Sequence, residues 1–289
     1  MNKKTEFIDL GERGRYNPKN KLNDLTGKEW IKFTKSWFIH RPKKRNDDEI
    51  LHPAKFPESL VKDFIEFFTK TNGWVLDPFS GTGSALIAAG ELNRNAVGIE
   101  LQKKYHSISE KRIAASNFRS SVKSVMGSAF NLKKVLEQNG FGEIKFDYVI
   151  TSPPYWNQLE RNNIRQKDRK EKGLDTFYSA EPEDIGNVKE YEEFIEKQAQ
   201  IFDQVYGVLK NRGYLTIITN NIYFNGRLYP LAYDTAISLT RRGKKSWILK
   251  DEKIWLQDDK PLIALGINNA WVGNRHHQYC LIFRKEENE

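Results

Sequence analysis

Two proline residues follow a short apolar run in the segment Thr151-Ser152-Pro153-Pro154-Tyr155-Trp156. The run before them is typical of a buried strand, and each proline fixes φ at about −65° and removes an N–H donor. We therefore expect a stiff tip at the carboxyl end of a strand, where open α/β sheets bind ligands. The Ser152 hydroxyl and the Pro153 carbonyl could accept the two N–H bonds of an amino group on a base, and Tyr155 could stack on that base. Such a tip suits methylation of an exocyclic nitrogen; a packed Pro-Pro loop is the alternative.

A glycine loop, residues 77–84, has the sequence Asp-Pro-Phe-Ser-Gly-Thr-Gly-Ser. It lies between a predicted strand, 74–76, and a predicted helix, 85–92, and a second strand, 95–99, ends in Glu100. An acid at this place can bind ribose hydroxyls. A dinucleotide fingerprint requires a third glycine where this chain has Leu86, whereas the Asp77 carboxylate would pair with the cationic methionine end of S-adenosylmethionine. The loop therefore favours S-adenosylmethionine over a dinucleotide.

The elements that must position these loops alternate along the chain. Helical spacing of apolar residues predicts helices at 58–70, 102–116, 132–138, 187–209 and 231–239. Short apolar runs predict strands at 122–126, before the proline tip, and at 213–218, 252–257 and 278–284. This alternation predicts an α/β fold with a largely parallel sheet.

Composition points to a polyanionic partner. The 289 residues carry a formal net charge of +9 and the isoelectric point is near 9.3, which favours nucleic acid. The single cysteine, Cys280, excludes an internal disulfide framework, and no apolar run is long enough to span a membrane. We expect a soluble, cytoplasmic protein. His276 and His277 lack ligands at metal-binding spacing, so no metal site is predicted.

Two basic segments are candidates for contact with DNA. Residues 1–50 form a predicted N-terminal arm, and within it residues 35–45 interleave aromatic and basic side chains. The candidate contacts of the arm are Trp37, Arg41, Lys43, Lys44 and Arg45. An insertion at about 157–186 divides the predicted catalytic domain, 51–289, and follows the proline tip directly. Its candidate contacts are Arg161, Arg165, Lys167 and Arg169, together with Trp156 before it. For the arm, the alternative is a solvated segment whose Trp37 and Phe38 pack on the core. For the insertion, it is a solvated and partly disordered loop.

Together the two loops resemble those of the S-adenosylmethionine-dependent amino-methyltransferases of DNA, over about residues 50–285. The resemblance implies a Rossmann-like class I methyltransferase fold, with seven strands, an antiparallel last strand and helices on both faces. It implies an amino-group site at Ser152, Pro153, Pro154 and Tyr155. It also implies a cofactor site whose expected residues are Lys55, Pro57, Asp77, Phe79, Ser80, Gly81, Thr82, Gly83, Ser84, Glu100 and Ser128.

The resemblance implies methyl transfer from S-adenosylmethionine to a base flipped out of double-stranded DNA. A serine at position 152 favours N4 of cytosine over N6 of adenine. Guanine N2 in structured RNA and a silent DNA-binding subunit remain alternatives. Cytosine C5 chemistry is rejected, because it needs a cysteine nucleophile and Cys280 lies in a predicted strand. A restriction endonuclease as partner, and monomer or homodimer as assembly, are left open.

Three features depart from the family pattern. Ser128 stands where an acidic or amide group often contacts the cofactor's adenine. The cofactor loop precedes the catalytic loop, whereas many members with a serine have the reverse order. No separate target-recognition domain is evident, so residues 1–50, 157–186 or 258–277 must read the bases if any segment does.

Overall fold

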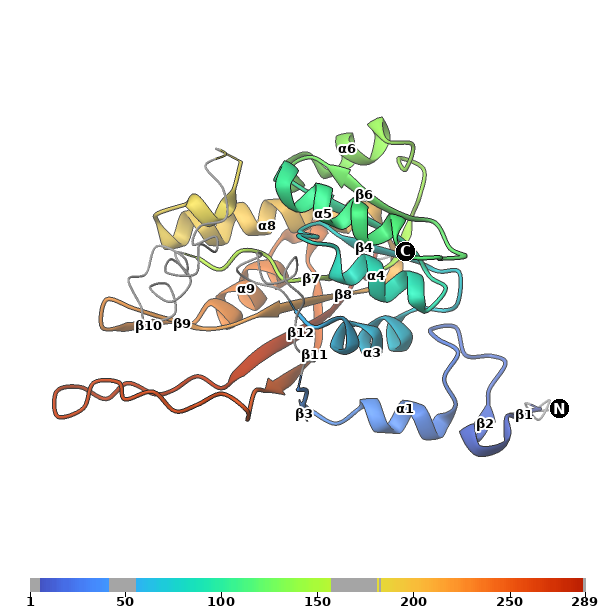
Figure 1. Cartoon of the computed structure of the whole chain (residues 1–289), viewed down its shortest axis with the longest axis horizontal. Coiled ribbons are helices and arrows are strands. Elements are labelled where there is room, and N and C mark those ends of the chain that lie inside the picture. Colours follow the sequence, from blue (N-terminus) through green and yellow to red (C-terminus); the bar gives the residue numbers. More distant parts are fainter. Residues whose placement is uncertain (1–5, 42–55, 157–180, 182, 288–289) are drawn as a thin grey trace.

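A central sheet of eight strands organises the molecule (Figure 1). The computed structural model describes residues 6–41, 56–156, 181 and 183–287. In the order in which they pair, the strands are β3 (Trp37–Ile39), β11 (Ile248–Leu256), β12 (His277–Arg284), β8 (Leu209–Thr219), β7 (Phe146–Thr151), β4 (Trp74–Asp77), β5 (Asn95–Glu100) and β6 (Val122–Met126).

The sheet is mostly parallel. Strands β8, β7, β4, β5 and β6 pair in parallel, and β12 runs antiparallel to both of its neighbours, β8 and β11. This confirms the predicted Rossmann-like class I fold with an antiparallel last strand. Seven strands come from the predicted catalytic domain. The eighth, β3, was not predicted, because its three residues owe their strand conformation to pairing with β11.

Helices cover both faces of the sheet because neighbouring residues of each strand point to opposite sides. In β4, Val75 packs in the cluster that contains α3 and α4, whereas Leu76 packs in the cluster that contains α6, α8 and α9. The main helices are α3 (Glu58–Phe68), α4 (Ser84–Glu91), α5 (Lys103–Ala114), α6 (Leu132–Gln138), α8 (Tyr191–Val208) and α9 (Leu231–Thr240).

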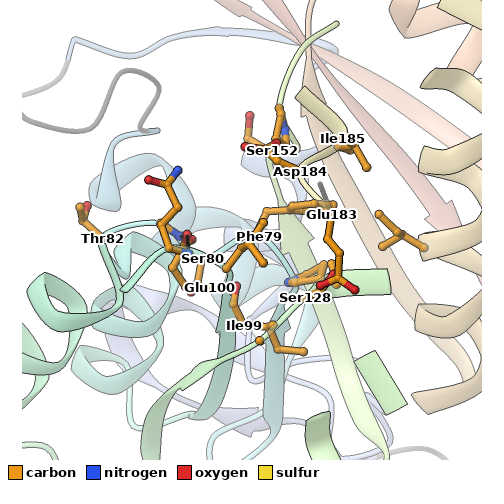
Figure 2. A pocket seen from close by; sticks show the side chains of 18 of the residues that line it. Phe79, Ser80, Thr82, Ile99, Glu100, Ser128, Ser152, Glu183, Asp184 and Ile185 are labelled. Carbon is orange, nitrogen blue, oxygen red and sulfur yellow. Dashed lines mark hydrogen bonds between the residues drawn. The ribbon is translucent and has the colours of Figure 1, made fainter. Parts of the chain in front are cut away.

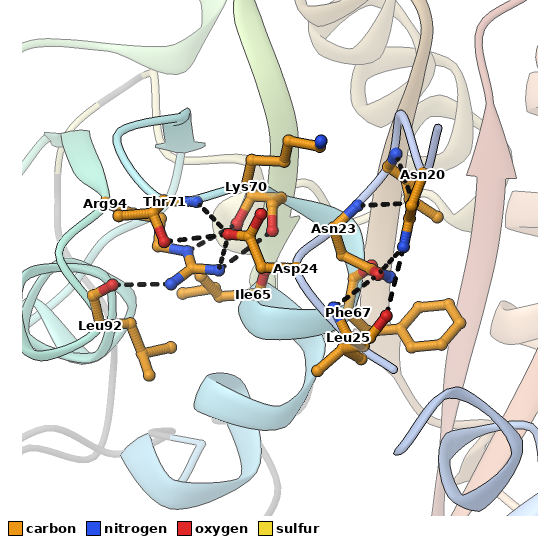
Figure 3. A network of polar contacts seen from close by, with 12 residues as sticks. Asn20, Asn23, Asp24, Leu25, Ile65, Phe67, Lys70, Thr71, Leu92 and Arg94 are labelled. Carbon is orange, nitrogen blue, oxygen red and sulfur yellow. Dashed lines mark hydrogen bonds and ion pairs between the residues drawn. The ribbon is translucent and has the colours of Figure 1, made fainter. Parts of the chain in front are cut away.

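The N-terminal segment, 6–41, is anchored to this body. It contains a small hairpin of β1 (Ile8–Asp9) and β2 (Arg15–Tyr16), and then α1 (Gly27–Phe33), which begins with a capping box at Thr26. Figure 3 shows the polar anchors. The Asn23 amide donates to the Phe67 carbonyl at 2.6 Å, and Asp24 accepts from the backbone N–H of Thr71 at 2.8 Å. The ring of Phe33 in α1 stacks on Phe67 with centroids 4.2 Å apart.

Two connections extend from the carboxyl edge of the sheet, to the left in Figure 1. The first is a hairpin of β9 (Ile222–Phe224) and β10 (Arg227–Tyr229), whose turn uses positive φ at Asn225 and Gly226. The second, which we call the projecting loop, comprises residues 257–276 between β11 and β12. Among the helices of the described residues, none combines the length and apolar character that crossing a membrane requires.

Candidate active site

The glycine loop turns the chain sharply between β4 and α4. Gly81 and Gly83 have φ values of 52° and 82°, a region that glycine enters without steric cost. A Cβ added to Gly83 would lie 2.3 Å from the Ser109 hydroxyl oxygen. The loop is pinned to the next strand by Ser80, whose backbone N–H donates to the Ile99 carbonyl at 3.0 Å. Its backbone is therefore held close to the ends of β4 and β5.

Glu100 ends β5 and faces the glycine loop. One carboxylate oxygen accepts from the Gly81 N–H at 2.8 Å, and the other accepts from the Gln102 N–H at 2.8 Å. Burial raises the pKa of Glu100 to about 7, against the opposing effect of these two hydrogen bonds. Each carboxylate oxygen has a further lone pair, so Glu100 can still accept hydrogen bonds from a ligand.

Asp77 links the two predicted loops. Its Oδ1 accepts from the Thr151 hydroxyl at 2.6 Å and from the Phe79 N–H at 3.1 Å. Its Oδ2 is buried and has no hydrogen-bond partner among the described residues, and the same holds for the Thr82 hydroxyl. Burial raises the pKa of Asp77 to about 7. A buried carboxylate oxygen without a partner is costly, which favours a cationic or hydrogen-bonding ligand here.

The catalytic loop begins where β7 ends, one residue after Thr151. Ser152 and Pro154 face the same cavity as the glycine loop. Tyr155 is 8% exposed, does not line the cavity, and donates its hydroxyl to Gln278 Oε1 at 3.1 Å. Burial raises the pKa of the Tyr155 phenol to about 12, so at neutral pH it is a neutral hydrogen-bond donor.

The two loops share one cavity, which encloses about 800 Å³ of space when the part open to solvent is included. Figure 2 shows side chains of both loops around it. Of the residues predicted from sequence, those that line it are Phe79, Ser80, Gly81, Thr82, Ser84, Glu100, Ser128, Ser152 and Pro154. Pro57, Asp77, Gly83, Pro153 and Tyr155 adjoin lining residues in the chain without lining the cavity themselves. Lys55 lies outside the described residues.

Several lining residues were not predicted. Phe56, Pro78, Leu101, Gln102, Gly127 and Ala129 are sequence neighbours of predicted residues, and Ile99 and Ile201 come from β5 and α8. The unexpected contribution is Glu183-Asp184-Ile185, from the end of the segment interpreted as a basic insertion. Asp184 accepts from the Gly186 N–H at 2.8 Å. An Asp-x-Gly turn was the only local signal there, and it does not indicate which cavity the turn joins.

The predicted DNA contacts differ in how exposed they are. Trp37 is 42% exposed, with the Lys35 ammonium 3.3 Å from its ring centroid, and Arg41 is paired with Asp258 at 2.6 Å. Trp156 is only 4% exposed, and its indole N–H donates to the Lys189 carbonyl at 3.0 Å. Trp156 therefore packs in an aromatic cluster, and a DNA contact would require it to leave. The remaining candidates, Lys43, Lys44, Arg45, Arg161, Arg165, Lys167 and Arg169, lie outside the described residues.

The described residues bring no three His, Cys, Asp or Glu side chains together in a group that could hold a metal ion. Cys280 is fully buried in β12, and burial raises the pKa of its thiol to about 12. A thiol in this state is a poor nucleophile. Cys280 does not line the cavity formed by the two loops.

Comparison with known proteins identifies relatives of this chain. Residues 2–111 and 146–289 match the family of N6/N4 DNA methylases. The type II methyltransferase M.BglI of Bacillus subtilis is 33% identical over 121 residues, which are 40% of this chain and 34% of that protein. M.HinfI of Haemophilus influenzae is 40% identical over 92 residues, 32% of this chain and 22% of that protein. The chain thus spans about a third or less of the length of these relatives.

The comparison with solved structures also finds similarity over most of the chain. The methyltransferase-like protein SMU.1697c of Streptococcus mutans, solved in complex with S-adenosylhomocysteine, is 12% identical, with a TM-score of 0.45, and covers 80% of this chain and 99% of that one. The cofactor of this family is S-adenosylmethionine. The unpaired buried oxygens of Asp77 and Thr82 fit a polar, cationic ligand of this kind. By its match over most of its length, the chain belongs to the N6/N4 DNA methylase family.

Proposed function

We propose that this protein methylates an exocyclic amino nitrogen of a base in double-stranded DNA, and that the nitrogen is N4 of cytosine. The observation that carries the proposal is the shared cavity: Ser152 of the catalytic loop lines the same space as Gly81 and Glu100 of the glycine loop. The hydrogen bond between Thr151 and Asp77 holds the two loops together. Family membership supports the amino nitrogen as the acceptor.

The chain's own residues provide for the cofactor. Glu100 would accept from ribose hydroxyls. Asp77 Oδ2 would pair with the cofactor's ammonium group, which requires the ligand to reach past the neighbouring lining residue Pro78, because Asp77 does not itself line the cavity. Phe79 and Ser128 also line the cavity, and Ser128 already orients its hydroxyl through the Phe130 N–H at 3.3 Å. When bound, the cofactor supplies an electrophilic methyl group. Pairing with a cation would relieve the cost of ionising the buried Asp77.

The catalytic loop would prepare the amino group. Ser152 Oγ and the Pro153 carbonyl would each accept one N–H bond, which draws the nitrogen lone pair out of conjugation with the ring. The contact with Pro153 requires its carbonyl to be uncovered, because only Ser152 and Pro154 of this loop line the cavity. Tyr155 anchors the loop through Gln278, which keeps these two acceptors in place. Stacking by Tyr155 on the base would require the ring to be uncovered, because it does not line the cavity.

The choice of N4 of cytosine rests on the residue type at position 152. A serine hydroxyl offers one acceptor and can also donate a hydrogen bond, whereas the carboxylate or amide of adenine N6 enzymes is a stronger acceptor. Adenine N6 is therefore the competing assignment within the same family. Covalent chemistry at cytosine C5 is disfavoured by the buried thiol of Cys280.

Nucleoside analysis tests this proposal directly. The purified full chain would be incubated with isotope-labelled S-adenosylmethionine and PCR-amplified genomic DNA, which carries no methylation, with transfer RNA in a parallel reaction. After digestion, mass spectrometry should find label in N4-methylcytosine. Label in N6-methyladenine would overturn the assignment of the base, and label only in RNA guanosine would overturn DNA as the substrate. Cofactor binding without transfer to either would point to a silent subunit.

A further inference from the structure

The projecting loop, 257–276, exposes large apolar side chains. Trp271 is 90% exposed, Leu262 is 81% exposed and Ile267 is 67% exposed. Isolated surface apolar residues are ordinary, but several on one extension mark a surface that contacts a partner. The proposed chemistry does not use this loop.

Hydrogen bonds across the loop give it a defined shape. At the root, the Gln257 N–H donates to the His276 carbonyl at 2.7 Å. Midway, Asn274 donates to the Ile263 carbonyl and accepts from the Ile263 N–H, both at 2.9 Å. At the tip, the Gly266 carbonyl accepts from Asn269 and Ala270 at 3.0 and 2.9 Å. The indole of Trp271 is thus presented by a structured loop before any partner binds.

The strand that follows the projecting loop contacts the catalytic loop. Strand β11 runs in the same direction as β8, because both pair antiparallel with β12. The projecting loop therefore leaves the sheet at the edge where β4, β5 and β7 end, the edge that carries the cavity. Two residues after the loop, in β12, Gln278 Oε1 accepts from the Tyr155 hydroxyl at 3.1 Å. A partner held by this loop therefore approaches the edge of the sheet that carries the cavity.

Charge at the root indicates what kind of partner this is. The loop contains two acids, Asp258 and Asp259, and two cations, Lys260 and Arg275. Asp258 is already paired with Arg41 at 2.6 Å. Arg275 has no ion-pair partner in the part of the chain that the structure describes, and its Nε is buried without a hydrogen bond there. A guanidinium with an unsatisfied nitrogen, four residues after an exposed indole, suits a partner that combines phosphates with stackable rings.

We propose that the projecting loop enters the DNA at the target site and that Trp271 stacks in the gap left by the flipped base, with Arg275 on a nearby phosphate. The inference rests on the proposed function, since only base extrusion creates such a gap. Extruding a base sacrifices its stacking and pairing. An apolar side chain inserted between base steps is a known physical means of offsetting that loss, and an indole presents a broad flat face for it.

Binding to a duplex with a preformed gap tests the proposal without knowledge of the recognition sequence. Fluorescence anisotropy would compare a labelled 30-base-pair duplex that contains one abasic site with its fully paired parent, in the presence of S-adenosylhomocysteine. The full chain should prefer the abasic duplex by about 5-fold or more, given typical base–aromatic stacking. Trp271→Ala should abolish the preference, and Trp271→Phe should keep part of it. Arg275→Gln should reduce the salt dependence of binding by about one phosphate contact.

Matched variants and a second measurement make the result decisive. Ile31→Ala removes an exposed apolar side chain from α1 and should leave the preference unchanged. If the wild type shows no preference, or if Trp271→Ala keeps it, the proposal is wrong. If Trp271→Ala instead converts a dimer to a monomer in sedimentation velocity without altering DNA binding, the loop contacts a second copy. Methylation of unmethylated DNA by the wild type, measured in parallel, shows whether only this inference or the proposed function itself has failed.

Discussion

Two regions at the carboxyl edge of the sheet, the cofactor cavity and the projecting loop, differ in how much of their surface is buried. On the cofactor side, the glycine loop and the catalytic loop are buried and joined by hydrogen bonds, such as those from Gly81 to Glu100 and from Thr151 to Asp77. On the other side, the projecting loop exposes Trp271 and keeps its shape through a few hydrogen bonds of its own. A small, charged ligand needs a buried pocket whose polar groups are already in place in the folded protein. A large partner can bind to an exposed surface.

The buried side carries an electrostatic cost that the exposed side does not. Asp77 and Glu100 both have a pKa raised to about 7, mainly by burial, and the charge on Asp77 contributes to the rise at Glu100. Folding thus leaves two carboxylates with part of their charge uncompensated. We infer that ligand binding, and not further packing, offsets this cost. The following variants test how independent the two sides are.

Ser152→Ala should have the largest effect on activity and almost none on cofactor binding. The variant removes an acceptor for the target amino group, and loss of one preorganised hydrogen-bonding group at a reacting centre costs about 100-fold in turnover. Single-turnover methylation and calorimetry with S-adenosylhomocysteine would measure the two effects. Ser124→Ala, on β6, is the matched control. Turnover at the parental rate would remove Ser152 from the proposed mechanism.

Gly83→Ala should destabilise the cofactor side. The added Cβ would lie 2.3 Å from the Ser109 hydroxyl oxygen, at a φ of 82°, so we expect a loss of about 2 kcal/mol or more in the free energy of unfolding. Gly140→Ala is a close control, because its φ is 81° and nothing lies within 4 Å of the added atom. Urea unfolding should show a clearly smaller loss there. Equal losses would mean that backbone conformation alone limits position 83.

Cofactor affinity should rise with pH between about 6 and 8. Pairing with a cation requires ionised Asp77, whose pKa in the unliganded protein is about 7, so the dissociation constant should fall about 10-fold over this range. The raised pKa also means that the unliganded fold loses stability as pH rises from about 4 through 7. Calorimetry at several pH values would measure the slope. Asp77→Asn should weaken cofactor binding and reduce its dependence on pH; Glu100 would account for the dependence that remains. An unchanged pH dependence in this variant would contradict the pairing of Asp77 with the cofactor's ammonium group.

Asn274→Ala should have the smallest effect, and on DNA only. It removes both hydrogen bonds between Asn274 and Ile263 that hold the projecting loop in shape. The variant loop must then lose conformational entropy each time it binds DNA. We expect about 3-fold weaker DNA binding, with the unfolding free energy and the cofactor affinity unchanged. Asn139→Ala, which removes one side-chain hydrogen bond to the Val135 carbonyl on α6, is the control. A large loss of stability would show that the loop is part of the core.

Local sequence sufficed for most of the fold. The strand at 122–126 and the helix at 132–138 have the predicted ends, and the predicted helix at 58–70 ends only two residues earlier, at Phe68. The glycine loop and the proline tip were also recognisable, because glycine and proline restrict the backbone wherever they occur. Parallel strands with intervening helices then place both loops at one edge of the sheet.

Contacts between distant segments could not be read in this way. Strand β3 exists because Trp37–Ile39 pairs with β11, more than two hundred residues later, and Glu183-Asp184-Ile185 returns to the cavity from beyond the insertion. The aromatic residue Trp156 looked like a DNA contact but is buried by Tyr191, Phe224 and Tyr229. Periodicity and turn chemistry act over a few residues, so they determine which elements and loops form. Side-chain burial and the completion of a cavity depend on which remote surfaces meet, and folding of the whole chain decides that.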